Sequence, residues 1–378
     1  MALVSISFTQ CALGALVAYG LYRVYWEFTV GAARRRMIKE NGCKPPKKLP
    51  QSDPILGLDL LYSALTALKK HTFLEETKQR FDKTGNTYHS HMSGKSATLT
   101  LEPENLKTML SLKFKDFGLG PQRREFAPLL GAGIFTTDGA AWQHSRELIR
   151  PNFVRSQVGN LDTFEHHVHH LIQAIPRDGS TVNLQDLFFR LTMDSATEFL
   201  FGESTNCLAP GASTESSTAF AEAFNRSQEA IGKHNRLGIF NLLPDPQFKK
   251  DVKTVHAFAD RYVNWALEYR KTHDVEKADP QPGARYVFLN ELVKGTTDPV
   301  QIRSELLNVL LAGRDTTASL LSNVWWTLSR RPDVWAKLRA EVDALGGEAP
   351  TFAQIKDMKY LRYVMNECES FSTDHPSS

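Results

Sequence analysis

One long segment near the C-terminal end of the chain constrains the fold more than any other part of the sequence. Between Pro299 and Arg330 the apolar residues recur with helical spacing, at Ile302, Leu306, Leu307, Leu310, Leu311, Leu320, Leu321, Val324 and Trp325. Apolar residues therefore occupy most sides of the expected helix, which is typical of a helix buried inside a large protein. The composition of the 378 residues, 42% hydrophobic and 23% charged, is that of a globular protein.

Six residues interrupt the apolar character of this helix, namely Ala312-Gly313-Arg314-Asp315-Thr316-Thr317. A glycine inside a helix costs about 1 kcal/mol relative to alanine, and a threonine there can bond the carbonyl four residues back and bend the backbone. We therefore predict a local opening beside Gly313, where Thr316 bonds the carbonyl of Ala312. The hydroxyl of Thr316 and the carboxylate of Asp315 could deliver protons to a small ligand there. The alternative is a kinked core helix without a function.

Two further segments precede this helix. Trp142 and Arg146 are four residues apart, so they share one face of a helix. An indole N–H beside a guanidinium suits an anionic group, although a surface cation–π pair explains the same pattern. Residues from Phe188 to Gly202 predict a packing helix that ends at the glycine.

Taken in this order, the segments resemble the haem-thiolate monooxygenases of the cytochrome P-450 family. The variants R-D-T-T-A and F-F-R-L-T-M-D-S-A-T look most like the fungal members that hydroxylate n-alkanes and fatty acids. The resemblance covers nearly everything up to Cys368 and implies a fold that is mainly α with a small β-sheet (α+β). It also implies a haem cofactor, with Trp142 and Arg146 holding a haem propionate and with Ala312 and Gly313 against the haem.

The same resemblance implies an activity. Thr316 would form a hydrogen bond with oxygen bound at the haem iron, and Asp315 would pass protons to it. Electrons would come from NADPH through a cytochrome reductase, and one oxygen atom would enter an unactivated C–H bond of a small apolar substrate. The substrate expected is a long-chain alkane or fatty acid, with an entrance lined by apolar residues between Phe220 and Leu243.

The cysteines do not supply the family's iron ligand. The family places it in a loop of pattern F-x-x-G-x-R-x-C-x-G, which this sequence does not contain, and we nominate no metal ligand among Cys11, Cys43, Cys207 and Cys368. Residues Lys356 to Cys368 resemble the start of the E-x-x-R helix, but Ser370 takes the arginine position after Glu367. We therefore expect a C-terminally truncated, inactive chain with an aberrant tail at 369–378. The alternative function is a haem-free binding or regulatory protein.

The N-terminal sequence predicts a membrane anchor. Residues Leu3 to Tyr22 are mostly apolar and have the length of one spanning helix. Basic residues follow on one side only, which places that side in the cytosol. We expect an anchor at 1–24, a basic linker with prolines at 25–55 and an incomplete catalytic domain at 56–378. The protein would then lie in the endoplasmic reticulum membrane as a single-pass protein with a cytosolic catalytic domain; an amphipathic surface helix is the alternative.

Other local patterns complete the sequence-based prediction. Strand-forming residues on either side of Ser93-Gly94 predict a hairpin over 86–101, and a helix is expected from Pro332 to Leu345, before two glycines. His166 and His170 have the spacing of zinc ligands but lack a catalytic glutamate between them, so we predict no metal site. The net charge of +3 does not indicate nucleic-acid binding.

Overall fold

The computed structural model describes residues 8–120, 123–153, 161–209, 211, 213–238, 244–272 and 286–371. The N-terminal half contains α1 Phe8–Trp26, η1 Glu27–Gly31, α2 Ala32–Glu40, α3 Leu58–Lys69, α4 Phe73–Thr84, α5 Pro103–Lys107, η2 Thr108–Leu112, η3 Phe114–Asp116, α6 Arg123–Leu130, α7 Gly139–Ile149, η5 Arg150–Phe153 and α9 Asp162–Ala174. The C-terminal half contains α10 Leu184–Phe201, α11 Glu215–Leu237, α12 Pro246–Thr272, α13 Phe288–Gly295, α14 Pro299–Leu328, α15 Pro332–Asp343, α16 Phe352–Asp357 and α17 Lys359–Phe371.

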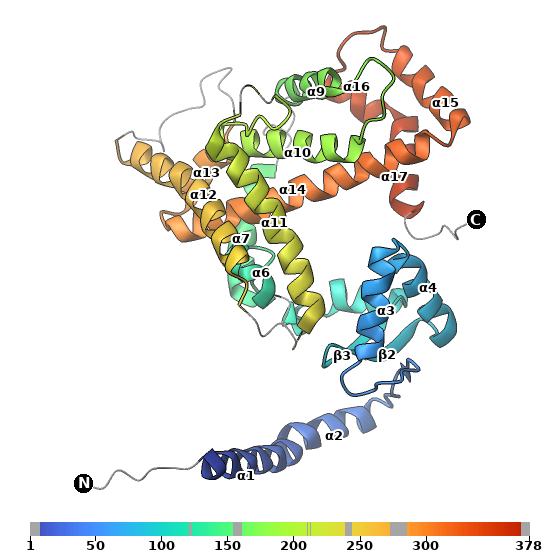
Figure 1. Cartoon of the computed structure of the whole chain (residues 1–378), viewed down its shortest axis with the longest axis vertical. Helices are drawn as coiled ribbons and strands as arrows, with labels where there is room; N and C mark the ends of the chain where they lie inside the picture. Colours follow the sequence, from blue (N-terminus) through green and yellow to red (C-terminus); the bar gives the residue numbers. More distant parts are fainter. Residues whose placement is uncertain are drawn as a thin grey trace.

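The helix α14 runs through the centre of the helical body, as expected for the long apolar segment (Figure 1). Helix α10 packs along it, α12 contacts it from another side, and α17 packs against its C-terminal part. Helices α11 and α12 pack against each other, and the main core lies between these helices, α6, α7 and α13. The predicted class, mainly α with a small sheet, is confirmed.

The small sheet has the order β1-β2-β3. Strands β2 (Thr87–Met92) and β3 (Lys95–Thr100) form the predicted antiparallel hairpin, and Ser93 and Gly94 at its turn both have positive φ. Strand β1 (Lys47–Lys48) pairs with β2 in parallel. Part of the predicted basic linker at 25–55 is therefore a strand of the sheet.

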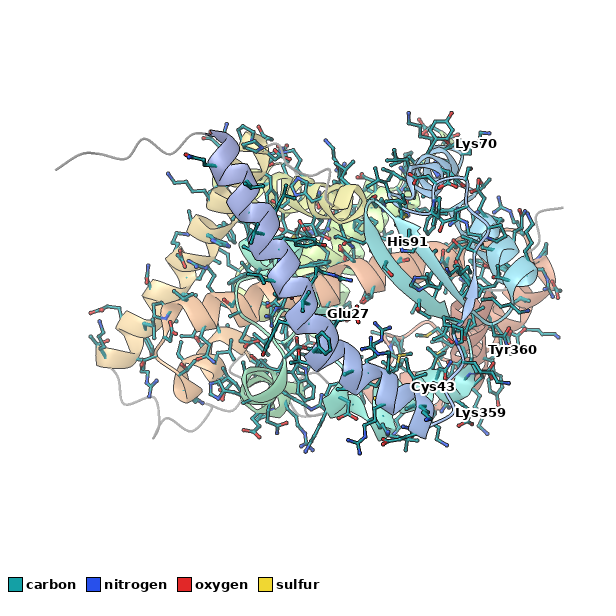
Figure 2. The ribbon with its side chains drawn as sticks, turned by 90° about the horizontal axis from the view of Figure 1, so that it is seen from below. Glu27, Cys43, Lys70, His91, Lys359 and Tyr360 are labelled. Carbon is teal, nitrogen blue, oxygen red and sulfur yellow. The ribbon has the colours of Figure 1, made fainter. Side chains whose placement is uncertain are left out.

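The described N-terminal residues form a long rod in which α1, η1 and α2 follow one another, with Glu27 at the junction (Figure 2). Glu27 pairs with Arg35 at 2.6 Å and with Arg23 at 3.6 Å. The predicted anchor began at Leu3, and residues 1–7 lie outside the described residues. None of the described helices has both the length and the apolar composition needed to cross a bilayer.

Helix α14 begins where the sequence predicts. The side chain of Asp298 accepts hydrogen bonds from the backbone N–H groups of Val300 and Gln301, and Pro299 occupies the first turn, where no N–H donor is needed. The helix is a single uninterrupted α-helix as far as Leu328. The predicted bond from Thr316 to the carbonyl of Ala312 is present, and the space beside Gly313 is open, but the helix continues through this point without a break.

Three polar side chains of α14 meet the segment that leads into α7. Asn308 is fully buried; its Nδ2 donates to the carbonyl of Leu130 (3.0 Å), and its Oδ1 accepts from the N–H of Phe135 (2.9 Å). The backbone approaches α14 so closely that a Cβ on Gly131 would lie 2.1 Å from Ser304 Oγ. A Cβ on Gly133 would lie 2.3 Å from Asn308 Nδ2, so both glycines are required by the packing.

Glu305 lies beside this contact and is also fully buried. Its Oε2 accepts from the N–H of Ile134 (3.3 Å), and Ser145 of α7 gives it a second hydrogen bond. Its Oε1 has no partner among the residues that the structure describes. Burial raises the pKa of Glu305, and these two hydrogen bonds oppose the shift only in part.

Elsewhere the predicted helix ends are confirmed. Gly202 ends α10 in the left-handed conformation, with φ of 82°. Helix α15 begins at Pro332 and ends at Asp343, shortly before Gly346 and Gly347. Thr351 and Gln354 form a capping box at the start of α16.

Replacing Asn308 with alanine should lower the free energy of unfolding by about 2–4 kcal/mol, because it leaves a buried carbonyl and a buried N–H unpaired. Urea denaturation of the whole chain measures the change. Asn290→Ala is the matched control, since Asn290 is exposed on α13, and it should change the free energy by less than about 0.5 kcal/mol. Equal effects of the two substitutions would contradict the structural role of Asn308.

Glu305 should make the stability depend on pH in a defined direction. Because its pKa is raised in the folded state, the folded chain binds a proton more tightly than the unfolded chain. Stability is then complete below the unfolded pKa of about 4.5 and falls as the pH rises through the folded pKa, by at most about 1.4 kcal/mol per pH unit. Urea denaturation at several pH values should show that Glu305→Gln lacks this loss. Parallel pH profiles for both proteins would contradict the prediction.

Candidate functional site

The predicted anion-binding pair lies together on α7. The guanidinium carbon of Arg146 is 5.4 Å from the ring centroid of Trp142, and the centroid of the Phe114 ring is 5.0 Å from that of the indole. Arg146 is exposed and makes no ion pair within the described part of the chain. A charged donor that no carboxylate neutralises is therefore available beside an indole N–H.

This pair borders a large cavity of about 1080 Å³. Most of its lining is apolar and comes from α5, η2, η3 and the segment before α7; it includes Leu106, Met109, Leu110, Phe114, Phe117, Leu119, Ile134 and Phe135. Trp142 and Arg146 contribute the aromatic and charged part of the wall. The cavity therefore combines an apolar interior with a cationic edge.

The glycine and threonine of α14 present an open face. Gly313 and Thr316 are one turn apart and both are exposed. A Cβ on Gly313 would have no described atom within 4 Å. The hydroxyl of Thr316 donates to the carbonyl of Ala312 at 2.7 Å, as predicted, which leaves its oxygen lone pairs free to accept a hydrogen bond.

Arg314 and Asp315 point away from this open face. Arg314 is buried, with its guanidinium carbon 4.9 Å from the ring centroid of Phe189 and 5.9 Å from that of Phe224. Its Nη1 lies 2.7 Å from Asp315 Oδ1. In the amide orientation that satisfies both groups, Gln228 donates to Asp315 and accepts from Arg314. Desolvation lowers the pKa of Arg314 and raises that of Asp315, while their mutual attraction opposes both shifts.

The predicted residues thus form two groups. Trp142 and Arg146 share one cavity, whose lining does not include Gly313 or Thr316. Asp315 is held by Arg314 on the side of α10 and α11. The role of Asp315 in passing protons stays a prediction.

Three of the apolar residues predicted to line a substrate entrance pack in the core instead, and the entrance itself stays a prediction. Phe220 and Phe224 are fully buried and Ile231 is nearly so, all within the main core against α12. Their helical spacing places them on the packed face of α11, which the sequence alone did not distinguish from a face lining a channel. Residues 239–243 lie outside the described residues.

Neither of the two sheltered cysteines has surroundings that favour a thiolate. Burial raises the pKa of Cys207 to about 11, and the charge of Asp194 acts in the same direction. Burial between α14 and α17 also raises the pKa of Cys368. Both environments therefore favour the protonated thiol.

The histidine-rich helix α9 exposes His166 and His169 and buries His167. His167 is buried and hydrogen-bonded to Glu198 of α10, while His166 and His170 stack at 4.4 Å. The described residues contain no group of three potential metal ligands.

The polar residues that position the site were not among the predicted site residues. Glu305 and Asn308 follow Ser304 by one and four residues, so the three side chains lie on one side of an otherwise apolar helix. That spacing was a usable signal for a buried polar contact. Nothing in the sequence indicated that their partners would be backbone groups of residues 130–135.

The family model of cytochrome P450 matches residues 50–368, so the chain belongs to the cytochrome P450 family. A cytochrome P450 monooxygenase, himC, of Aspergillus japonicus is 41% identical over 358 residues, which are 93% of this chain and 63% of that protein. Cytochrome P450 52A12 of Debaryomyces hansenii is 40% identical over 88% of this chain and 66% of its own length. The chain therefore spans about two thirds of the length of these relatives.

The fold agrees with this membership. The crystal structure of the cytochrome P450DA heme domain superposes with a TM-score of 0.67 at 18% identity, covering 86% of this chain and 69% of that one. The predicted family is thereby confirmed, and with it a monooxygenase family that uses haem. The described residues fit that cofactor, because Arg146 lacks an ion-pair partner and Trp142 adds an N–H donor at the edge of a large apolar cavity.

The open space beside Gly313 predicts an unusual substitution effect. Gly313→Ala should raise the free energy of unfolding by about 1 kcal/mol, because alanine favours the helix and meets no neighbouring atom. Gly133→Ala, the matched change, should lower it because of the contact with Asn308. Urea denaturation compares the two variants; a loss of stability in Gly313→Ala would show that the space is filled.

Proposed function

We propose that this chain carries the haem-binding and oxygen-facing parts of a monooxygenase that hydroxylates a long-chain aliphatic substrate, an n-alkane or a fatty acid. The observation that carries the proposal is the Trp142–Arg146 pair at the edge of the apolar cavity of about 1080 Å³. When bound, haem supplies the iron at which oxygen is reduced. Electrons would come from NADPH through a reductase at the endoplasmic reticulum membrane.

The chain's own residues would have distinct tasks. Arg146 and the indole N–H of Trp142 would bind and orient an anionic propionate, since a charged donor forms stronger hydrogen bonds than a neutral one. Gly313 would leave room beside α14. Thr316 would accept a hydrogen bond from a water molecule or a protonated ligand at its Oγ1, because its own proton is engaged by Ala312.

Apolar side chains support the proposed substrate class. Leu106, Leu110 and Phe117 line the cavity with hydrocarbon surface, which would exclude water and bind an aliphatic chain. The resemblance of the R-D-T-T-A segment to fungal hydroxylases of alkanes and fatty acids points in the same direction.

One observation favours a second candidate, a haem-free binding protein. Among the described residues, none of Cys43, Cys207 and Cys368 lines the cavity beside Trp142 and Arg146, so no thiol lies at the proposed haem site. A reduced, CO-treated sample distinguishes the candidates, because a thiolate-ligated haem gives the Soret band after which the family is named.

Haem titrated into the whole chain, followed by its Soret absorbance, tests the proposed propionate site. Arg146→Gln should weaken haem binding about tenfold, because a charged hydrogen bond contributes about 1.5–3 kcal/mol. Arg150→Gln is the matched control, an exposed arginine one turn further on, and it should leave the affinity unchanged. Indistinguishable affinities for the two variants would refute the role of Arg146, and a folded chain that takes up no haem would favour the second candidate.

A further inference from the structure

A cavity of about 510 Å³ lies between α12 and the first two turns of α11, and we call it the basic groove. Its α12 residues recur at helical spacing and so form one continuous face of that helix, namely Lys250, Lys253, Thr254, Ala257, Phe258 and Arg261. Helix α11 contributes Ser216 and Ala219. The lining therefore contains three cations and no carboxylate, and it shares no residue with the cavity assigned to haem.

The three cations of the basic groove have no ion-pair partner in the part of the chain that the structure describes. Lys250 and Lys253 are exposed on α12. Arg261 is held in place, because its guanidinium carbon lies 5.2 Å from the ring centroid of Phe258 and 4.8 Å from that of Tyr262. Its Nη2 donates to the tyrosine hydroxyl at 2.8 Å. The groove thus combines one positioned guanidinium with two flexible ammonium groups.

The carboxylates that occur among these residues of α12 are engaged elsewhere. Asp251 is buried and pairs with Arg226 of α11 at 2.8 Å. Asp260 pairs with an arginine of α14 at 2.7 Å. Glu203, which follows α10, accepts a hydrogen bond at 2.7 Å from the tyrosine that Arg261 contacts, and it does not line the groove. The positive charge in the groove is therefore not neutralised by carboxylates within it.

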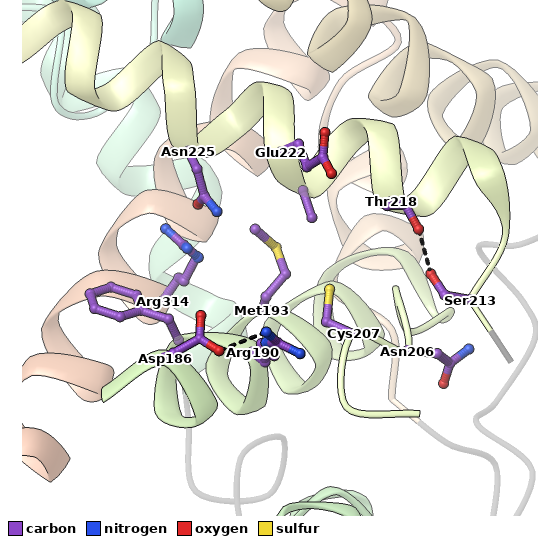
Figure 3. Close-up of a pocket in the computed structure, with 12 residues that line it drawn as sticks. Asp186, Arg190, Met193, Asn206, Cys207, Ser213, Thr218, Glu222, Asn225 and Arg314 are labelled. Atoms are coloured by element: carbon purple, nitrogen blue, oxygen red, sulfur yellow. Dashed lines mark hydrogen bonds and ion pairs between the residues drawn. The ribbon is translucent and has the colours of Figure 1, made fainter. Parts of the chain in front are cut away.

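The start of α11 adds a hydroxyl donor. The hydroxyls of Ser213 and Thr218 lie 2.9 Å apart and fix the first turn (Figure 3). The hydroxyl of Ser216 makes no hydrogen bond with the described residues, so it can donate to a ligand. Glu222 lies on another side of α11, where it lines the cavity against α10 (Figure 3), and the exposed Glu215 does not line the groove.

Cations that line one space without an opposing carboxylate suit an anion with several charges. Lys253 and Arg261 are eight residues apart, about 12 Å along α12, which is further than one phosphate group extends. We propose that the basic groove binds a compact ligand with two or more phosphate groups, one on Arg261 and another on Lys250 and Lys253. Both side chains are common phosphate ligands, and the volume is that of a small-molecule site. The proposal needs no haem, so it is independent of the proposed function.

Tripolyphosphate is the probe, titrated calorimetrically into the whole chain at physiological ionic strength, where attraction to scattered surface charges is largely screened. It should bind saturably and at least about tenfold more tightly than inorganic phosphate, because its groups contact several cations at once. Equal affinities for the two anions, or no saturable binding, would overturn the proposal.

Single substitutions test whether the groove itself is the site. Lys253→Gln and Arg261→Gln should each weaken tripolyphosphate binding about fivefold, the upper end of what one exposed ion pair contributes. Lys249→Gln is the matched control, because it removes the same charge from an exposed residue of α12 that does not line the groove. It should leave the affinity unchanged. Equal losses in all three variants would indicate diffuse attraction and refute the site.

A further pair of variants keeps all the cations. Ala257 is exposed on α12 and lines the groove, so Ala257→Glu places a carboxylate inside it without disturbing the core. This variant should abolish tripolyphosphate binding, whereas Ala257→Gln, of the same size, should retain it. Undiminished binding in Ala257→Glu would contradict the proposal.

Vesicles distinguish a lipid head group from a free ligand. Binding is compared between phosphatidylcholine vesicles with and without phosphatidylinositol bisphosphate, so that any apolar contribution of the exposed α1 cancels. A gain that Lys253→Gln removes assigns the groove to a lipid head group, and tripolyphosphate binding without such a gain assigns it to a soluble ligand. A gain that Lys253→Gln leaves intact, with no binding of tripolyphosphate, would overturn the proposal.

Discussion

Buried hydrogen bonds between α14 and the segment that follows α6 hold the candidate site together. Asn308 engages two backbone groups of that segment at once, and Glu305 adds a third contact together with Ser145 of α7. The helix that presents Trp142 and Arg146 is therefore fixed against the helix that presents Gly313 and Thr316. Such contacts are directional, so they set the relative position of two helices more closely than apolar packing alone.

This contact between α14 and the α6–α7 connection restricts which residues a few positions can carry. Gly131 and Gly133 can carry no side chain, because α14 occupies the space where a Cβ would lie. Glu305 is buried with one oxygen unpaired within the described structure, and its pKa is raised as a result. A natural core seldom keeps such groups without a use. Here the use is the fixed approach of the α6–α7 connection to α14.

Much of the fold could be predicted from local signals. Apolar periodicity predicted α14, and Gly202 predicted the end of α10. The hairpin followed from its turn residues. Long-range contacts could not be predicted in this way: Phe220 and Phe224 carry the same apolar pattern whether they face a core or a channel, and only the position of α12 decides between these alternatives.

The six-residue motif of α14 explains why the site was only half predictable. Residues three apart share a face of a helix, and successive residues are rotated by about 100°. Gly313 and Thr316 accordingly share the open face, whereas Arg314 is turned into the core between Phe189 and Phe224. Burial would make the charge of Asp315 costly if Arg314 did not pair with it. One short sequence therefore serves two sides of α14: Gly313 and Thr316 lie on its open face, and the buried ion pair of Arg314 and Asp315 lies on the side that packs against α10 and α11.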